Sequence, residues 1–210
     1  HLLVAPHTLK TQVHAMIDTE IEKARNQQPA EILMKLNSLT DRKIIDRLQE
    51  ASSAGVQVRL IIRGICCLLP GIPGYTEHVE VHSIVGRYLE HARVYCFGSG
   101  PYQRIFISSA DMMTRNTEKR VEVACPIYEE RLKQRILSDL RIMWSDNVKA
   151  RRLQSDGSYA RLPQSGERID SQDQLMRTAI LAAEDASRKQ SEEKESLWER
   201  VHHRLFSQKK

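Results

Sequence analysis

Two side chains separated by one residue, His91 and Arg93, are the first candidates for chemistry in this sequence. They stand at the entry to a predicted strand, where an extended backbone places alternate residues on one face. An imidazole, with a pKa of about 6.5, donates or accepts a proton near neutrality, and a guanidinium only donates hydrogen bonds. The pair therefore suits an anionic ligand, and in phosphoryl transfer His91 could be a nucleophile, an acid or a donor to a phosphate. A solvated surface pair between His91 and the adjacent Glu90 is the alternative.

Arg63 is the second candidate, because it ends a predicted strand and is followed by Gly64. A planar guanidinium can hold two phosphate oxygens at once, and each charge-assisted hydrogen bond contributes about 1.5–3 kcal/mol. An anion could approach both this guanidinium and the nearby backbone. The alternative is an arginine at a strand end that contacts only water.

A third group stands at the end of the strand predicted at residues 105–107, where Ser108, Ser109 and Asp111 supply two hydroxyls and a carboxylate. These groups could orient an imidazole or bind phosphate oxygens, although Ser and Asp are also ordinary turn residues at a strand end. Arg115 and Arg120 follow and add two cations. Together they extend the basic region that begins at the arginine of the second group.

The elements that must position these residues alternate between helix and strand. Apolar residues recur at helical spacing from Leu9 until Pro29, and Thr40 can cap a second helix that Gly55 closes. The order strand, capped helix, strand is typical of a right-handed crossover and a parallel sheet. The candidate groups stand at strand ends and loops, where open α/β sheets bind ligands. Strands are predicted at residues 32–36, 56–62, 79–85, 94–97, 105–107 and 121–127 and a further helix at residues 132–144, which is an α/β fold with a mixed sheet flanked by helices.

We predict three segments along the chain. They are an α/β domain at residues 1–148, an extended basic segment at residues 149–169 and a helical tail at residues 170–210. The tail is expected to be a solvated helix or an oligomer contact. In it, Trp198, Val201 and Leu205 share a face that could dock on a partner subunit.

The composition of the 210 residues, with 40% hydrophobic and 28% charged residues and a net charge of +5, excludes a wholly disordered chain. No apolar run reaches the ~18 residues of a membrane helix, and the small positive excess suits an anionic ligand without requiring nucleic acid. Four cysteines without metal-site spacing indicate a reducing, cytoplasmic compartment and no metal site. The sequence starts without an initiator Met, inside an apolar run, so we expect a piece of a longer polypeptide.

The succession His-x-Arg, strand and Ser-Ser-x-Asp resembles the second half of the phospholipase D-like superfamily. The halves of that superfamily carry His-x-Lys and then a strand that ends in a Ser-x-Asn pattern. This sequence departs from the pattern at Arg93 and Asp111. The resemblance implies a phospholipase D-like half-domain.

Nearly everything from Leu2 to about Arg168 looks like the C-terminal part of the bacterial polyphosphate kinase family, and four segments carry this resemblance. The segments are KLNSL at 35–39, IRGICCL at 62–68, SIVGRYLEH at 83–91 and SSADMMTRN at 108–116. The resemblance implies reversible transfer of the terminal phosphate of ATP to inorganic polyphosphate, with Mg²⁺ and a phosphohistidine intermediate. It also implies site residues, which are Arg63 and His91 for the ATP phosphates, Arg93, Arg115 and Arg120 for further phosphate contacts, and Asn37, Ser108, Ser109 and Asp111 in supporting positions.

The same resemblance implies that this chain holds half of an active site. In the family, the phosphorylated histidine, a nucleotide-stacking tyrosine and the magnesium-associated arginines belong to the preceding half-domain, so Mg²⁺ ligands are expected outside this chain. The expected ligands are ATP or ADP and polyphosphate. The expected partners are the preceding half-domain and further copies of the chain, without specific nucleic acid. The isolated chain is expected to be inactive.

Two other functions remain open at this point. Two copies of the half-domain could pair as a phosphodiesterase or nuclease, with two His91 side chains facing one another. Alternatively, Arg63, Arg93, Arg115 and Arg120 could form a basic groove that binds polyphosphate or nucleic acid without catalysis.

Overall fold

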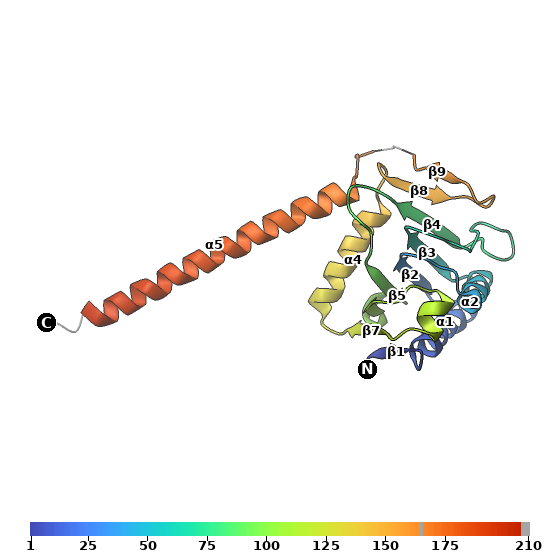
Figure 1. The fold of residues 1–210 in the computed structure, drawn as a ribbon, viewed down its shortest axis with the longest axis horizontal. Helices are drawn as coiled ribbons and strands as arrows, with labels where there is room; N and C mark the ends of the chain where they lie inside the picture. Colours follow the sequence, from blue (N-terminus) through green and yellow to red (C-terminus); the bar gives the residue numbers. More distant parts are fainter. Residues whose placement is uncertain (164–165, 207–210) are drawn as a thin grey trace. The chain divides into compact units, whose positions relative to one another are not determined.

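A mixed β-sheet is the centre of the part of the chain from His1 to Ser171 (Figure 1). The computed structural model describes residues 1–163 and 166–206, of which residues 191–206 are described by their backbone alone. In this described part the sheet has nine strands. They are β1 (Leu3–Ala5), β2 (Glu31–Leu36), β3 (Gln57–Ile62), β4 (Val79–Ile84), β5 (Arg93–Phe97), β6 (Arg104–Ser108), β7 (Glu122–Ile127), β8 (Ala150–Leu153) and β9 (Tyr159–Arg161).

The strand order is β1-β7-β6-β5-β2-β3-β4-β8-β9. The β2–β3 and β3–β4 pairs are parallel, and the β2–β5, β5–β6 and β6–β7 pairs are antiparallel. The predicted mixed sheet is therefore confirmed, and so is the parallel pair around the second helix. The chain forms two compact units, His1–Ser171 and Gln172–Lys210, and the sheet lies in the first.

Helices cover both faces of this sheet (Figure 1). On one face, α1 (Leu9–Arg25) and α2 (Arg42–Ser53) pack on Met34 and other inward residues of the central strands. On the other face, α4 (Glu130–Trp144) packs through Leu140 on Ile61 and its neighbours. The two cores follow from the alternation of side chains along each strand.

The ends of α2 show how local sequence sets a helix. Its N-cap is Asp41, whose carboxylate accepts the Ile44 N–H at 3.3 Å. The predicted cap, Thr40, is one residue early: the N–H groups of Thr40 and Asp41 are both bonded to the carbonyl of Met112 at 2.9 Å, and it is the side chain of Asp41 that accepts the first-turn N–H. Gly55 closes the helix as predicted, with a φ of +98° that favours glycine.

The first unit extends beyond the predicted end at residue 148. Residues predicted to be an extended surface segment include the hairpin β8–β9, and β8 pairs with β4. Asp146 fixes this extension, because its buried carboxylate accepts the N–H groups of Lys149 and Ala150 and the hydroxyl of Ser171. The basic residues of the hairpin hide its strand pattern in the sequence.

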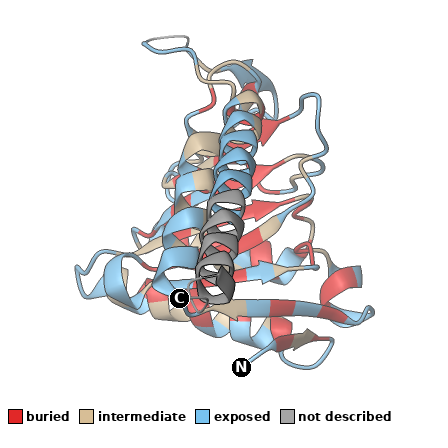
Figure 2. Cartoon of the chain, turned by 90° about the vertical axis from the view of Figure 1, so that its left-hand side faces the viewer, coloured by how far each residue is buried: buried red, intermediate tan, exposed pale blue. Residues whose placement is uncertain are grey.

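A helix of 36 residues, α5 (Ser171–Phe206), follows. Its described side chains are mostly exposed after the first turns, in contrast to the buried strands of the sheet (Figure 2). The predicted docking face at Trp198, Val201 and Leu205 lies outside the described side chains. Within residues 1–163 and 166–206, no helix is both long and apolar enough to cross a membrane.

Candidate functional site

The candidate residues gather at one edge of the sheet. Asn37 and Arg63 directly follow the parallel strands β2 and β3, and Arg93 begins β5, two residues after His91. Because β5 is antiparallel to β2, the start of β5 lies beside the end of β2. By the same rule the end of β6, and with it Asp111, lies beside the start of β5. The topology therefore brings together residues that lie far apart in the sequence.

The first part of the site is a linked set formed by Arg63, Asn37 and Asp111. Arg63 donates from Nε to Asn37 Oδ1 at 2.7 Å, and its Nη2 donates to the same oxygen. The backbone N–H groups of Asn37 and Ser38 both donate to Asp111 Oδ1, at 2.6 and 3.0 Å. Asp111 is almost completely buried, so these bonds fix the loop after β2 against the loop after β6.

The second part of the site joins Asp111 to His91 through Arg93. Arg93 Nη2 lies 2.7 Å from Asp111 Oδ2, and Arg93 Nη1 lies 3.2 Å from His91 Nδ1 and 2.9 Å from the His91 carbonyl oxygen. Arg63, Asn37, Asp111, Arg93 and His91 therefore form one continuous series of hydrogen bonds, which we call the Arg63–His91 chain.

This series determines the proton position on the neutral His91 ring. An arginine has N–H donors and no acceptor, so His91 Nδ1 must accept the bond from Arg93. The ring proton of the neutral imidazole is then on Nε2. Since His91 is exposed, its Nε2–H is a hydrogen-bond donor available to a ligand.

Arg93 is placed differently from Arg63. Its side chain is 12% exposed and its guanidinium contacts Asp111 and His91, so it orients the imidazole. Its Nε is buried and has no hydrogen-bond partner among the described residues. The sequence predicted a phosphate contact for Arg93, and the geometry favours a role in holding His91.

The serine hydroxyls at the end of β6 bond to neighbouring backbone and side chains. Ser108 Oγ donates to the Val123 carbonyl at 2.9 Å and accepts the Ala110 N–H at 3.0 Å. Ser109 Oγ donates to the Glu122 carboxylate and accepts the Val123 N–H at 3.1 Å. Both serines therefore hold the end of β6 against β7.

Arg115 and Arg120 lie at the periphery of the site. Arg115 is exposed in the short helix α3 (Thr114–Glu118), which the sequence did not predict. Arg120 is half exposed and its Nη1 lies 4.0 Å from Glu122 Oε1. Among the described residues, neither arginine takes part in the hydrogen bonds of the Arg63–His91 chain.

The prediction missed a buried ion pair beneath His91. Lys35, in β2, is 1% exposed, and its Nζ lies 3.0 Å from Glu90 Oε2. The same Nζ lies 3.5 Å from the Ala92 carbonyl oxygen. The one available signal was a lysine inside the apolar strand run from Ile32 to Leu36.

The carboxylates of the site do not fit a magnesium ion. Asp111 is bonded to Arg93 and to two amides, and Glu122 is bonded to Ser109 and Asn116. Among the residues that the structure describes, no three His, Cys, Asp or Glu side chains are grouped as a metal site would require. No step through a metal ion is therefore derived from this chain.

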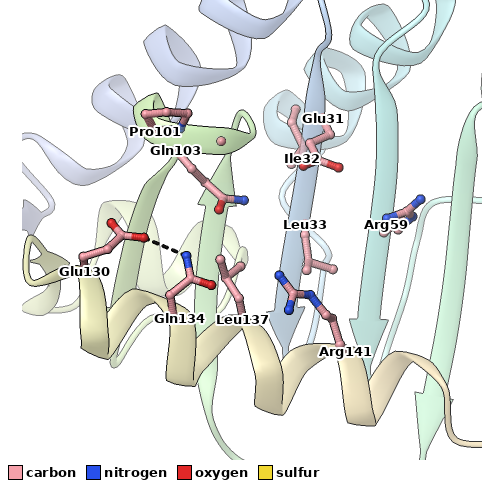
Figure 3. A pocket seen from close by; sticks show the side chains of 11 residues that line it. Glu31, Ile32, Leu33, Arg59, Pro101, Gln103, Glu130, Gln134, Leu137 and Arg141 are labelled. Atoms are coloured by element: carbon pink, nitrogen blue, oxygen red, sulfur yellow. Dashed lines mark hydrogen bonds between the residues drawn. The ribbon is translucent and has the colours of Figure 1, made fainter.

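A groove of about 580 Å³ lies at the opposite end of β2, between the sheet and α4 (Figure 3). It contains Arg59 and Arg141 but also Glu31 and Glu130 (Figure 3). The mixed charges do not favour a polyanion. This groove is therefore not a candidate phosphate site.

Residues 2–173 match the family model described as polyphosphate kinase C-terminal domain 2. The chain belongs to this family. Most of the chain is also similar to individual polyphosphate kinases. The polyphosphate kinase of Bacillus anthracis is 48% identical over 180 residues, which is 85% of this chain and 26% of the relative. The polyphosphate kinase of Pseudomonas aeruginosa is 48% identical over 165 residues, 79% of this chain and 24% of the relative. The chain thus spans about a quarter of the polyphosphate kinases it matches.

Solved structures support the same family. The crystal structure of polyphosphate kinase from Porphyromonas gingivalis superposes with a TM-score of 0.83 and 36% identity, over 88% of this chain and 28% of that one. NUC of Salmonella typhimurium, a phospholipase D family member, superposes with a TM-score of 0.55 and 17% identity, over 74% of this chain and 97% of its own. This second likeness shows the fold alone, and it confirms the predicted phospholipase D-like fold.

Proposed function

We propose that this chain supplies one half of the active site of an enzyme that reversibly transfers the terminal phosphate of ATP to inorganic polyphosphate. The observation that carries the proposal is the family match over residues 2–173, because it covers the whole sheet edge with the Arg63–His91 chain. In this proposal the phosphohistidine forms in the preceding half-domain, which also supplies the Mg²⁺ ligands. The present chain binds and orients the phosphates of ATP or ADP.

Arg63 is proposed to bind a phosphate of the nucleotide. Two of its five N–H groups contact Asn37 Oδ1, so the plane of the guanidinium is fixed and three N–H groups remain for phosphate oxygens. A guanidinium oriented before the ligand arrives loses less side-chain entropy on binding. Arg115 and Arg120, which are exposed at the same end of the sheet, are proposed to contact more distant phosphates.

His91 is proposed to donate from Nε2–H to an oxygen of the transferred phosphoryl group. Arg93 holds Nδ1 as the acceptor, and Asp111 holds Arg93. A donor that is already aimed stabilises charge as it develops in the transition state without a cost of reorganisation. His91 is therefore a candidate catalytic residue, and Arg93 and Asp111 are positioning residues.

Exposed apolar residues support a partner beside this site. Ile107, Val121 and Val123, on and next to β6 and β7, are 45%, 83% and 38% exposed. We assign this surface to the preceding half-domain, since burying it would cover apolar area and close the site against water.

We also propose a homo-oligomer without specific nucleic acid. A cytoplasmic location is supported by the four free cysteines.

The test uses a polyphosphate kinase polypeptide that contains this chain together with its preceding half. We expect His91→Ala to lower ATP synthesis from polyphosphate by about 100-fold or more, and Arg63→Ala by roughly 10- to 100-fold. Arg47→Ala is the matched control, because Arg47 of α2 pairs with Asp18 of α1 and with no residue of the Arg63–His91 chain. Near-normal turnover of either site variant would remove that residue from the site.

A second test uses the 210-residue chain alone with ATP, Mg²⁺ and polyphosphate. We expect no polymer synthesis, because the nucleophilic histidine belongs to the other half in this proposal. Robust synthesis would contradict it. Hydrolysis of a model phosphodiester by the isolated chain, lost in His91→Ala, would instead support the nuclease alternative.

A further inference from the structure

Lys35 is a buried cation that the proposed reaction does not use. It lies near the end of the central strand β2, with 1% of its side chain exposed, on the face that also carries Leu33 and next to Ile61 of β3. Removing an ammonium group from water is costly, and an apolar side chain of similar size is often as stable or more stable at such a position. Stability alone therefore does not explain a lysine here.

The contacts of Lys35 are directed to the two residues on either side of His91. Its Nζ lies 3.0 Å from the carboxylate of Glu90, which precedes His91, and 3.5 Å from the carbonyl oxygen of Ala92, which follows it. One rigid strand thus holds both ends of the three-residue segment that carries the imidazole. Glu90 is itself 12% exposed, so water screens this pair only weakly.

The second hold on His91 comes from the opposite face of the sheet. Arg93 and Val94 are neighbours in β5, so their side chains point to opposite faces. Val94 belongs to the core under α4 and pairs in register with Lys35 of β2, which places Lys35 on that face. Arg93 contacts the ring and the carbonyl of His91 from one face of the sheet. From the other face, Lys35 contacts Glu90 and Ala92, the residues on either side of His91.

We propose that Lys35 is a positioning residue for His91, acting through Glu90 and Ala92. The inference rests on the proposed function for its effect on turnover, but not for its effect on the imidazole. Without the ammonium group, residues 90–92 lose their attachment to β2. The His91 ring then no longer stays within reach of Arg93, and its Nε2–H is no longer aimed at a fixed point.

The first experiment uses nitrogen NMR of labelled histidine in the 210-residue chain to determine which ring nitrogen of the neutral His91 carries the proton. In the unaltered chain we expect one neutral tautomer, protonated at Nε2. In Lys35→Met we expect a mixture of both tautomers, and in Lys35→Arg, which keeps the charge, a return toward Nε2. An unchanged single tautomer in Lys35→Met would overturn the proposal.

The second experiment measures turnover in the longer polypeptide. Lys35→Met is expected to lower kcat about 10- to 100-fold, but less than about twofold when His91 is already alanine, since residues that act as a unit are not additive. An equal loss in both backgrounds would show a merely structural role and overturn the proposal. If Lys35→Met does not fold, Glu90→Gln gives the same comparison with the lysine retained.

The matched control is a partly buried ion pair of α1, next to the far end of β5. Lys23 pairs with the buried Glu20 at 2.7 Å, next to Gly98, which follows β5. Lys23→Met should leave both the His91 tautomer and kcat within about twofold of the unaltered protein. If His91→Ala keeps full activity while Lys35→Met still mixes the tautomers, the proposed function fails and the positioning role stands.

Discussion

Replacement of Asp111 by alanine tests the central junction of the site. The Asp111 carboxylate accepts three hydrogen bonds, from the N–H groups of Asn37 and Ser38 and from Arg93 Nη2. It is 3% exposed, and Arg93 is 12% exposed on its side chain, so water replaces these bonds poorly. Asp111→Ala would leave two amides and a buried guanidinium without their acceptor.

Removing one partner of a buried ion pair costs about 3–5 kcal/mol. Three charge-assisted hydrogen bonds at about 1.5–3 kcal/mol each give a larger sum, and relaxation of the loops reduces it. For a chain of this size, each kcal/mol lowers Tm by roughly 2–4 °C, so Asp111→Ala should lower Tm by roughly 6–20 °C. Asp111→Asn should lose less, because its amide oxygen can still accept the two backbone N–H groups.

Thermal and urea unfolding of the 210-residue chain, followed by circular dichroism, measure this loss. The control is Asp46→Ala, since Asp46 is an exposed residue of α2 whose loss should change stability by no more than about 0.5 kcal/mol. Equal stabilities of Asp111→Ala and the unaltered chain would refute the reasoning. Equal losses for Asp111→Ala and Asp111→Asn would place the energy in the Arg93 pair alone.

Three further outcomes are expected. Burial tends to raise the pKa of Asp146, but hydrogen bonds from a serine hydroxyl and from backbone N–H groups lower that pKa below its usual value. The stability of the unaltered chain relative to Asp146→Asn should therefore be largest above about pH 4 and be lost as the pH falls through the lowered pKa. Urea unfolding of both proteins at several pH values measures this difference. Gly64→Ala places a Cβ 2.8 Å from the backbone oxygen of Asn37, so it should destabilise the chain by about 1–3 kcal/mol, measured by urea unfolding. Burial raises the pKa of the Cys96 thiol to about 12, so iodoacetamide should label the exposed Cys67 and leave Cys96 unlabelled until the chain unfolds, as mass spectrometry would show.

The sequence predicted the central strands and α1, α2 and α4 because their signals are local. Apolar runs and helical spacing depend only on neighbouring residues, and both cores of the sheet follow from them. The prediction failed for β1 and α3, which have three and five residues and are too short for a periodic signal. It also failed for β8, where two arginines occupy a four-residue strand.

The candidate residues were identified by type, but their connections were not. Asp111 reaches Arg93 across 18 positions and the Asn37 amide across 74, and no spacing rule predicts such pairs. Lys35 and Glu90 were missed for the same reason, since they are 55 positions apart and meet only after β2 and β5 have paired.

The pairing of β8 with β4 has a practical consequence for any shortened version of this domain. A fragment ending at residue 148 would lack β8 and β9, and the backbone N–H and C=O groups that β4 presents to β8 would face solvent. An unpaired strand of this kind is a template for intermolecular association. Such a fragment should therefore aggregate on expression, whereas one that extends through Ser171 keeps the sheet edge covered.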